Sequence, residues 1–263
     1  MPRGKSPPSC IEHQLVRSGL MHSGEIPAPG ELFRHAFRRL KTEQDHLFRI
    51  AVLPTLLYFL IFVFLRPLEQ DLPELLLSLA LILIPETLFD VAWLRWILGA
   101  GADDPPLPFR WTLRHTRYCG RRLAVRFILM AALVPVIVIA SIFPENLRPV
   151  VLSACLPLLF YLSLRFSLFV VARAVDGTCD LRRSWEATRE GIWRFFWGAA
   201  FTAIPLLVLL AVIGELLNAA GIATTLPLAM MLLAATANFA LRALLLAVTA
   251  QVYDAKMTNR VIH

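Results

Sequence analysis

Residues 121–143 read RRLAVRFILMAALVPVIVIASIF, a segment with three arginines followed by seventeen residues without a charge. The apolar part, 127–143, approaches the roughly 20 residues that a helix needs to cross the hydrocarbon core of a bilayer. It shows no alternation of polar and apolar residues, which a transmembrane β-strand would show. The stretch therefore predicts a membrane-spanning α-helix with a basic segment at one end.

Similar apolar stretches recur along the chain, which has 263 residues, is 57% hydrophobic and has a mean hydropathy of +0.64. The other expected spans are 50–65, 74–98, 149–172, 192–214 and 226–250. A helix satisfies its own backbone hydrogen bonds, as lipid requires. We therefore expect an all-α polytopic membrane helix bundle with six transmembrane helices in an integral membrane domain, 30–263. Residues 1–29 are rich in proline, contain no secretory signal core and are expected to be a disordered tail.

The basic residues predict the orientation. Eight Lys or Arg precede the first span, six lie between spans two and three, five between spans four and five, and two follow the last span. The opposite loops carry only Arg66 and Arg148. Because loops rich in Lys and Arg remain in the cytoplasm, both termini are expected to be cytoplasmic. Two tryptophan pairs, Trp93 with Trp96 and Trp193 with Trp197, are expected at the inner interface.

Short outer loops predict that the spans pair into three hairpins. A basic segment that can form an amphipathic helix precedes each hairpin, at 31–48, 110–122 and 181–196, and Asp180 can cap the third. Such a helix lies flat at the lipid headgroups. The alternative is that these segments only satisfy topology and brace the bundle. The candidates for contact with anionic lipid are Arg34, Arg38, Arg39, Arg114, Arg117, Arg182 and Arg183.

Charged residues also fall inside the expected spans. Asp90, Arg165 and Arg242 each follow the outer end of their span by about 16 residues, which places them at one depth. Charges in a bilayer usually pair inside a bundle, so we expect Asp90 to pair with Arg165 or Arg242. Structural pairing, snorkelling of the arginines to the interface and a functional polar site all remain open. The expected intramembrane polar network is Glu86, Asp90, Arg165, Arg242, Asn238 and Tyr161.

The sequence gives no sign of catalysis. It has no nucleophile elbow, zinc-protease motif, P-loop or glycine-rich dinucleotide turn. The four cysteines and six histidines do not show metal-ligand spacing. No enzyme activity, metal or cofactor is therefore expected. The net charge of +7 lies beside apolar spans, so we expect the lipid bilayer as partner and not nucleic acid.

Two neighbouring segments carry a resemblance to a known group of proteins. Residues 161–177 read YLSLRFSLFVVARAVDG, and residues 181–196 read LRRSWEATREGIWRFF. This combination of an arginine in span four, an acidic turn and a helix containing Ser-Trp resembles uncharacterised bacterial six-helix inner-membrane proteins. It is similar to the membrane domain fused to some glycerophosphodiester phosphodiesterases. The phosphodiesterase barrel is absent from the sequence, so the resemblance implies a bacterial inner-membrane protein and no catalytic residue.

These observations together predict a function class but no specific activity. We expect a multi-pass protein of the bacterial inner (plasma) membrane that acts as a non-enzymatic accessory or interaction module. Anionic lipids and other membrane proteins are its expected partners. The alternative is a small-solute or lipid transporter built around Glu86, Asp90, Arg165 and Arg242.

Overall fold

The structure is a computed structural model that describes residues 25–65, 72–100, 111–221 and 225–258. These residues form an all-α fold, as expected. Its helices are α2 (Pro29–Thr42), α3 (Gln44–Leu65), α4 (Leu72–Ile97), α5 (Leu113–Ile142), α6 (Arg148–Ala174), α7 (Leu181–Arg189), α8 (Ile192–Ala219), α10 (Pro227–Tyr253) and a π-helical turn, Asp254–Thr258. Most of the expected N-terminal tail lies outside the described residues. At its end, the side chain of Ile26 is buried in the core.

Five helical segments in the described part of the chain are long and apolar enough to cross a membrane. They are Gln44–Phe64, Leu113–Ile142, Arg148–Ala174, Ile192–Ala219 and Pro227–Met257. These helices are compatible with a multi-pass integral membrane protein. The expected span at 74–98 forms α4, which is 26 residues long but is not among the five. A count of six spans therefore stays a prediction.

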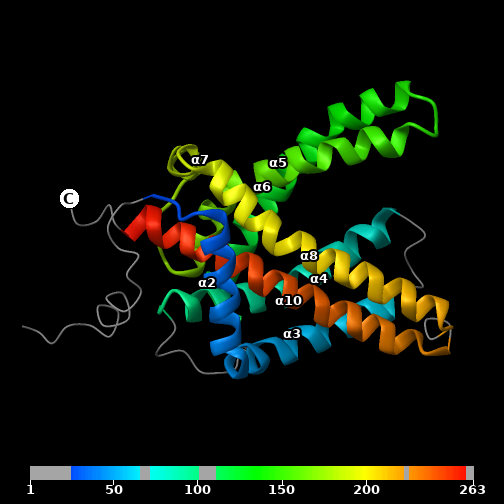
Figure 1. Ribbon diagram of the computed structural model, residues 1–263, viewed down its shortest axis with the longest axis horizontal. Coiled ribbons are helices and arrows are strands. Elements are labelled where there is room, and N and C mark those ends of the chain that lie inside the picture. The colour runs from blue at the N-terminus through cyan, green and yellow to red at the C-terminus, as the bar shows by residue number, and fades with distance from the viewer. Residues whose placement is uncertain (1–24, 66–71, 101–110, 222–224, 259–263) are drawn as a thin grey trace, which may run out of the picture.

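The long helices run side by side along the molecule, and α2 crosses them near one end (Figure 1). Neighbours along the chain pack together, α3 on α4, α5 on α6 and α8 on α10. Helix α10 also contacts α2, α3, α4 and α6, so it lies at the centre of the bundle. The α5–α6 pair leans away from the other helices toward one end (Figure 1).

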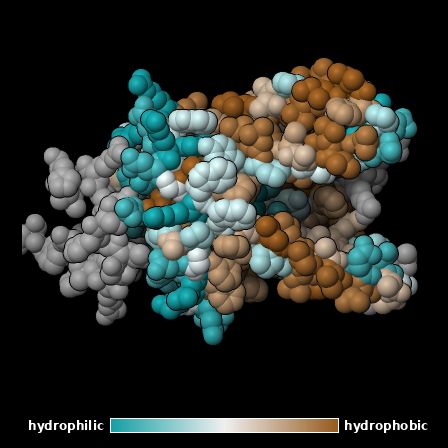
Figure 2. All heavy atoms as spheres, turned by 45° about the horizontal axis from the view of Figure 1, so that its top comes forward, coloured by the Kyte–Doolittle hydropathy of each residue, from teal (hydrophilic) through white to brown (hydrophobic). Residues whose placement is uncertain are grey.

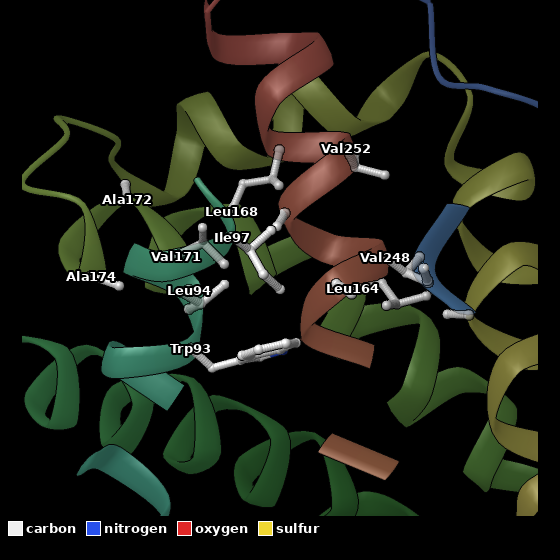
Figure 3. Packing of buried hydrophobic residues seen from close by; sticks show 14 of the residues in the cluster. Trp93, Leu94, Ile97, Leu164, Leu168, Val171, Ala172, Ala174, Val248 and Val252 are labelled. Atoms are coloured by element: carbon white, nitrogen blue, oxygen red, sulfur yellow. The ribbon is translucent and has the colours of Figure 1, made fainter. Parts of the chain in front are cut away.

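The core is concentrated in one half of the bundle, the half expected to lie toward the cytoplasm. The buried residues of α6 begin at Leu164, and those of α8 end at Ala203. Side chains of α4, α6 and α10 meet there (Figure 3). The indole of Trp93 is fully buried, and its Nε1 donates a hydrogen bond to the carbonyl of Ala243 at 3.0 Å. Trp93 is therefore a core residue and not the interface anchor expected from the sequence.

The other half of the bundle exposes apolar side chains. Figure 2 shows them gathered in two hydrophobic lobes with a hollow between them, while hydrophilic residues cover the opposite end. The exposed side chains on α5 include Met130, Val134 and Ile142. Such a surface suits a lipid environment, in which apolar groups gain little from burial against protein.

The three expected amphipathic segments differ in structure. The first, 31–48, is divided at Glu43 between α2 and the start of α3. The buried face of α2 is Leu32 and Ala36, while Phe33 and Phe37 are exposed. The buried face packs closely on α8, where a Cβ at Gly198 would lie 2.7 Å from a methyl group of Leu32. Helix α2 therefore has one apolar face toward the protein and another toward its surroundings.

The second expected segment, 110–122, is not a separate helix. From Leu113 onward it is continuous with α5, which runs without a break to Ile142. The third expected segment, 181–196, is divided at Gly191, whose φ of +87° ends the helical path between α7 and α8. Asp180 caps α7 as expected, because its carboxylate accepts a hydrogen bond from the backbone N–H of Arg183 at 2.7 Å.

Candidate functional site

Five charged side chains from three helices form one cluster. Helix α4 contributes two carboxylates, α5 contributes two guanidinium groups and α10 contributes one. We call this group the charge cluster, and its members are Glu86, Asp90, Arg122, Arg126 and Arg242. It joins one helix from each of the pairs α3–α4, α5–α6 and α8–α10.

Asp90 lies at the centre of the charge cluster and is 1% exposed. Arg242 donates to it twice, from Nε to Oδ1 at 3.1 Å and from Nη2 to Oδ2 at 2.7 Å. Arg122 Nη1 lies 2.6 Å from the same Oδ2, and the phenol of Tyr118 donates to it at 3.0 Å. The two-pronged contact with Arg242 is the geometry that makes arginine–carboxylate pairs strong.

Glu86 lies one turn away on α4 and is also surrounded by arginines. Its Oε2 accepts from Arg122 Nη2 at 2.5 Å and from Arg126 Nη2 at 2.8 Å. Its Oε1 lies 2.9 Å from Arg242 Nη1. All four carboxylate oxygens of Glu86 and Asp90 therefore have a cationic donor.

The charge cluster has more positive than negative groups. Three guanidinium groups face two carboxylates, which leaves one positive charge in excess. The side chains of Glu86 and Asp90 are 7% and 2% exposed, but that of Arg126 is 38% exposed. The excess charge is therefore accessible at Arg126, at the outer edge of the cluster.

Sequence reasoning found part of this cluster. It placed Glu86 and Asp90 on one face of α4 and proposed Arg242 as a partner of Asp90, and the structure brings these three together. It missed Arg122 and Arg126 because they were assigned to a cytoplasmic loop. A signal was present, because Tyr118, Arg122 and Arg126 follow one another at four-residue spacing and share one face of a helix.

Arg165 does not join the charge cluster, which corrects the expectation that it could pair with Asp90. Its guanidinium lies on the Tyr161 hydroxyl at 2.6 Å and on the Trp185 carbonyl at 3.1 Å, and 4.8 Å from the centre of the Trp185 ring. It makes no ion pair with a carboxylate of the described segments. Ser184 of α7 donates to the Arg165 carbonyl at 2.7 Å, so this region fastens α7 to α6.

Of the other expected members, Tyr161 accompanies Arg165 and Asn238 stands apart. The Asn238 Nδ2 is buried and has no hydrogen-bond partner in the parts of the chain that the structure describes. The six residues expected to form one polar network therefore lie apart. Glu86, Asp90 and Arg242 are in the charge cluster, Arg165 and Tyr161 are together at α7, and Asn238 is in neither place. Within residues 25–258, excluding the three internal gaps, no group of three or more His, Cys, Asp or Glu side chains could hold a metal ion.

Most of the arginines expected at lipid headgroups are exposed: Arg34, Arg38, Arg117, Arg182 and Arg183. Of these, Arg182 also pairs with Glu186, and Arg183 donates to the Thr178 carbonyl. Arg39 and Arg114 are partly buried, and they bind the Ile97 carbonyl and Asp176, respectively. Arg39 thus satisfies a carbonyl at the C-terminus of α4, where a cation also complements the helix dipole. Bracing of the bundle accounts for Arg39 and Arg114.

A smaller ionic group lies at the turn after α6. Asp176, in a left-handed conformation with φ of 58°, lies 2.6 Å from Arg114 of α5 and 3.3 Å from Arg95 of α4. The hydrogen bond from Arg114, with the charges of Arg114 and Arg95, lowers the pKa of Asp176 against an opposing contribution from burial. These pairs tie the ends of α4, α5 and α6 together. The Asp176 side chain is 58% exposed, so the pairs are not enclosed as a ligand site would be.

Comparison of the chain with protein-family models, with curated proteins and with solved structures found no match.

Proposed function

We propose that the protein is a six-span integral membrane protein of the bacterial inner membrane, with its spans in three hairpins and both termini in the cytoplasm. In this proposal it is a non-enzymatic accessory or interaction module. The resemblance of residues 161–196 to bacterial six-helix proteins supports the location, and the arginine distribution supports the orientation.

One observation carries the proposed role. The charge cluster joins α4, α5 and α10, and both carboxylates are fully occupied by arginines from other helices. Such a cluster holds three helical hairpins in one arrangement and leaves no acid available for proton transfer or nucleophilic attack. A rigid bundle with a large lipid-facing surface fits a scaffold for other membrane components better than it fits an enzyme.

The topology is tested with reporters fused to the full-length protein. Alkaline phosphatase, active outside the cytoplasm, and green fluorescent protein, fluorescent inside it, are placed at the N-terminus, after Glu145, after Gly177 and at the C-terminus. We expect phosphatase activity only at Glu145 and fluorescence at the other three sites. If α4 did not cross the membrane, five spans would place the two termini on opposite sides, which would contradict the proposal.

The alternative function, transport of a lipid or small anion, is favoured by the open position of Arg126 in the charge cluster. It is tested by reconstituting the protein in vesicles that contain fluorescent phosphatidylglycerol and reducing the outer leaflet with dithionite. For an accessory module we expect the protected fraction to equal that of protein-free vesicles, about one half. A protected fraction that falls toward zero only in protein-containing vesicles would replace the accessory role with lipid transport.

A further inference from the structure

Arg126 is the member of the charge cluster whose hydrogen-bonding groups are least used. A guanidinium carries five N–H donors. Arg242 uses Nε, Nη1 and Nη2 on Asp90 and Glu86. Arg126 uses only Nη2, on Glu86, and its Nε and Nη1 have no acceptor among the residues that the structure describes. Two of its donor groups, Nε and Nη1, are therefore free to hydrogen-bond oxygens of an anion.

The position of Arg126 along α5 gives an anion access to these two donor groups. The helix leaves the bundle here, and exposure of its side chains at four-residue intervals rises from 12% at Arg122 to 38% at Arg126 and 59% at Met130. Val134, one turn further, is 56% exposed. The free donors of the guanidinium are thus followed by an apolar track on the same side of α5.

The depth of Arg126 matches an inner-leaflet headgroup. Sixteen residues separate it from Ile142 at the outer end of α5, a rise of about 24 Å. The hydrocarbon core of a bilayer is about 30 Å thick. Arg126 then lies only about 6 Å inside the inner boundary, within reach of a lipid phosphate, whereas Met130 and Val134 lie at the depth of the acyl chains.

We propose that Arg126 binds the phosphate of an anionic phospholipid from the inner leaflet, with an acyl chain lying along Met130 and Val134. The one positive charge in excess in the charge cluster is complementary to a lipid with one net negative charge. A zwitterionic lipid would add its own cation to a site that already has this excess. The inference rests on the membrane-spanning arrangement proposed above, and it deepens that proposal by naming a lipid partner and its site.

The test uses the full-length protein, purified in detergent and titrated with dioleoylphosphatidylglycerol while bound lipid is counted by native mass spectrometry. We expect Arg126→Gln to weaken the tightest binding step about tenfold, as loss of a charge-assisted hydrogen-bonded pair does. Arg126→Lys keeps the charge but loses the planar fork, so its affinity should be intermediate. Arg49→Gln is the control, an exposed arginine of α3 that is not among the candidate lipid contacts, and should change the affinity less than about twofold.

Three results would overturn the inference. Equal binding of dioleoylphosphatidylcholine by the unaltered protein would show that the site does not select an anion, and this comparison needs no variant. An equal loss in Arg49→Gln would indicate diffuse surface attraction. Displacement of the lipid by inorganic phosphate would show a site for a free anion. If lipid selectivity is absent while both termini are cytoplasmic, this inference fails and the proposed topology stands.

Discussion

Replacing Asp90 with asparagine is expected to destabilise the protein by about 3–5 kcal/mol, the cost of removing one partner from a buried ion pair. The substitution preserves the shape of the side chain but removes the charge that faces Arg242 and Arg122. Both guanidinium groups would then remain in the bundle with Glu86 as their only counter-ion. The loss is measured as the change in free energy of unfolding in mixed detergent and dodecyl sulfate micelles.

A double variant separates the charge effect from a packing effect. Asp90→Asn combined with Arg242→Gln removes one charge of each sign, so we expect it to be more stable than Asp90→Asn alone. The control is Glu145→Gln, because Glu145 is 91% exposed and lies 3.9 Å from Arg148. Exposed pairs contribute about 0–1 kcal/mol, so the control should change stability little. If Asp90→Asn cost no more than this control, the charge cluster would not hold the helices together.

Trp93→Ala is expected to cost a similar amount, about 3–5 kcal/mol, through the cavity left by a large buried side chain. The indole is fully buried where α4 meets α10, and its removal also takes away the hydrogen bond to the Ala243 carbonyl. The expected result is a lower midpoint of thermal unfolding in detergent and less protein recovered from membranes. The midpoint of Trp93→Phe, which keeps part of the ring volume, should lie between those of the unaltered protein and Trp93→Ala.

The comparison for this prediction is Trp193→Ala, because Trp193 lies on α8 and is 62% exposed. The substitution removes the same atoms from an exposed position, where lipid or detergent can fill the space. We therefore expect the free energy of unfolding to fall by less than about 1 kcal/mol. Similar losses in the two variants would mean that Trp93 contributes through its position at the interface, as the sequence had suggested, and not through the core.

Apolar length and charge predicted most of the helices. The spans expected at 149–172 and 192–214 lie within helices of the structure, and those at 127–143 and 226–250 do so except for one end residue each, because a run of that length has no other means of satisfying its backbone in lipid. The residues at which helices begin and end were less predictable. The basic segment 110–122 was expected as a separate amphipathic helix, but α5 begins at Leu113 and includes most of it, since a helix can continue beyond the bilayer while its sequence becomes polar.

The candidate site was likewise predictable in part from the sequence. Depth along a helix follows from counting residues, so Asp90, Arg165 and Arg242 could be placed at one level from the sequence. The direction in which each side chain points could not be obtained in this way. Arg242 points to Asp90, whereas Arg165 points to Tyr161 and α7.

The sequence by itself determined that the protein is all-α and which stretches form its long helices. Only the tertiary structure decided which charges meet, that Arg122 and Arg126 belong with them, and that Trp93 is buried. The physical reason is that a helix in lipid is apolar on every side, since lipid tails are as apolar as a protein core. The pattern that marks the inner face of a helix in a water-soluble protein is therefore missing, and helix rotation is decided by packing alone.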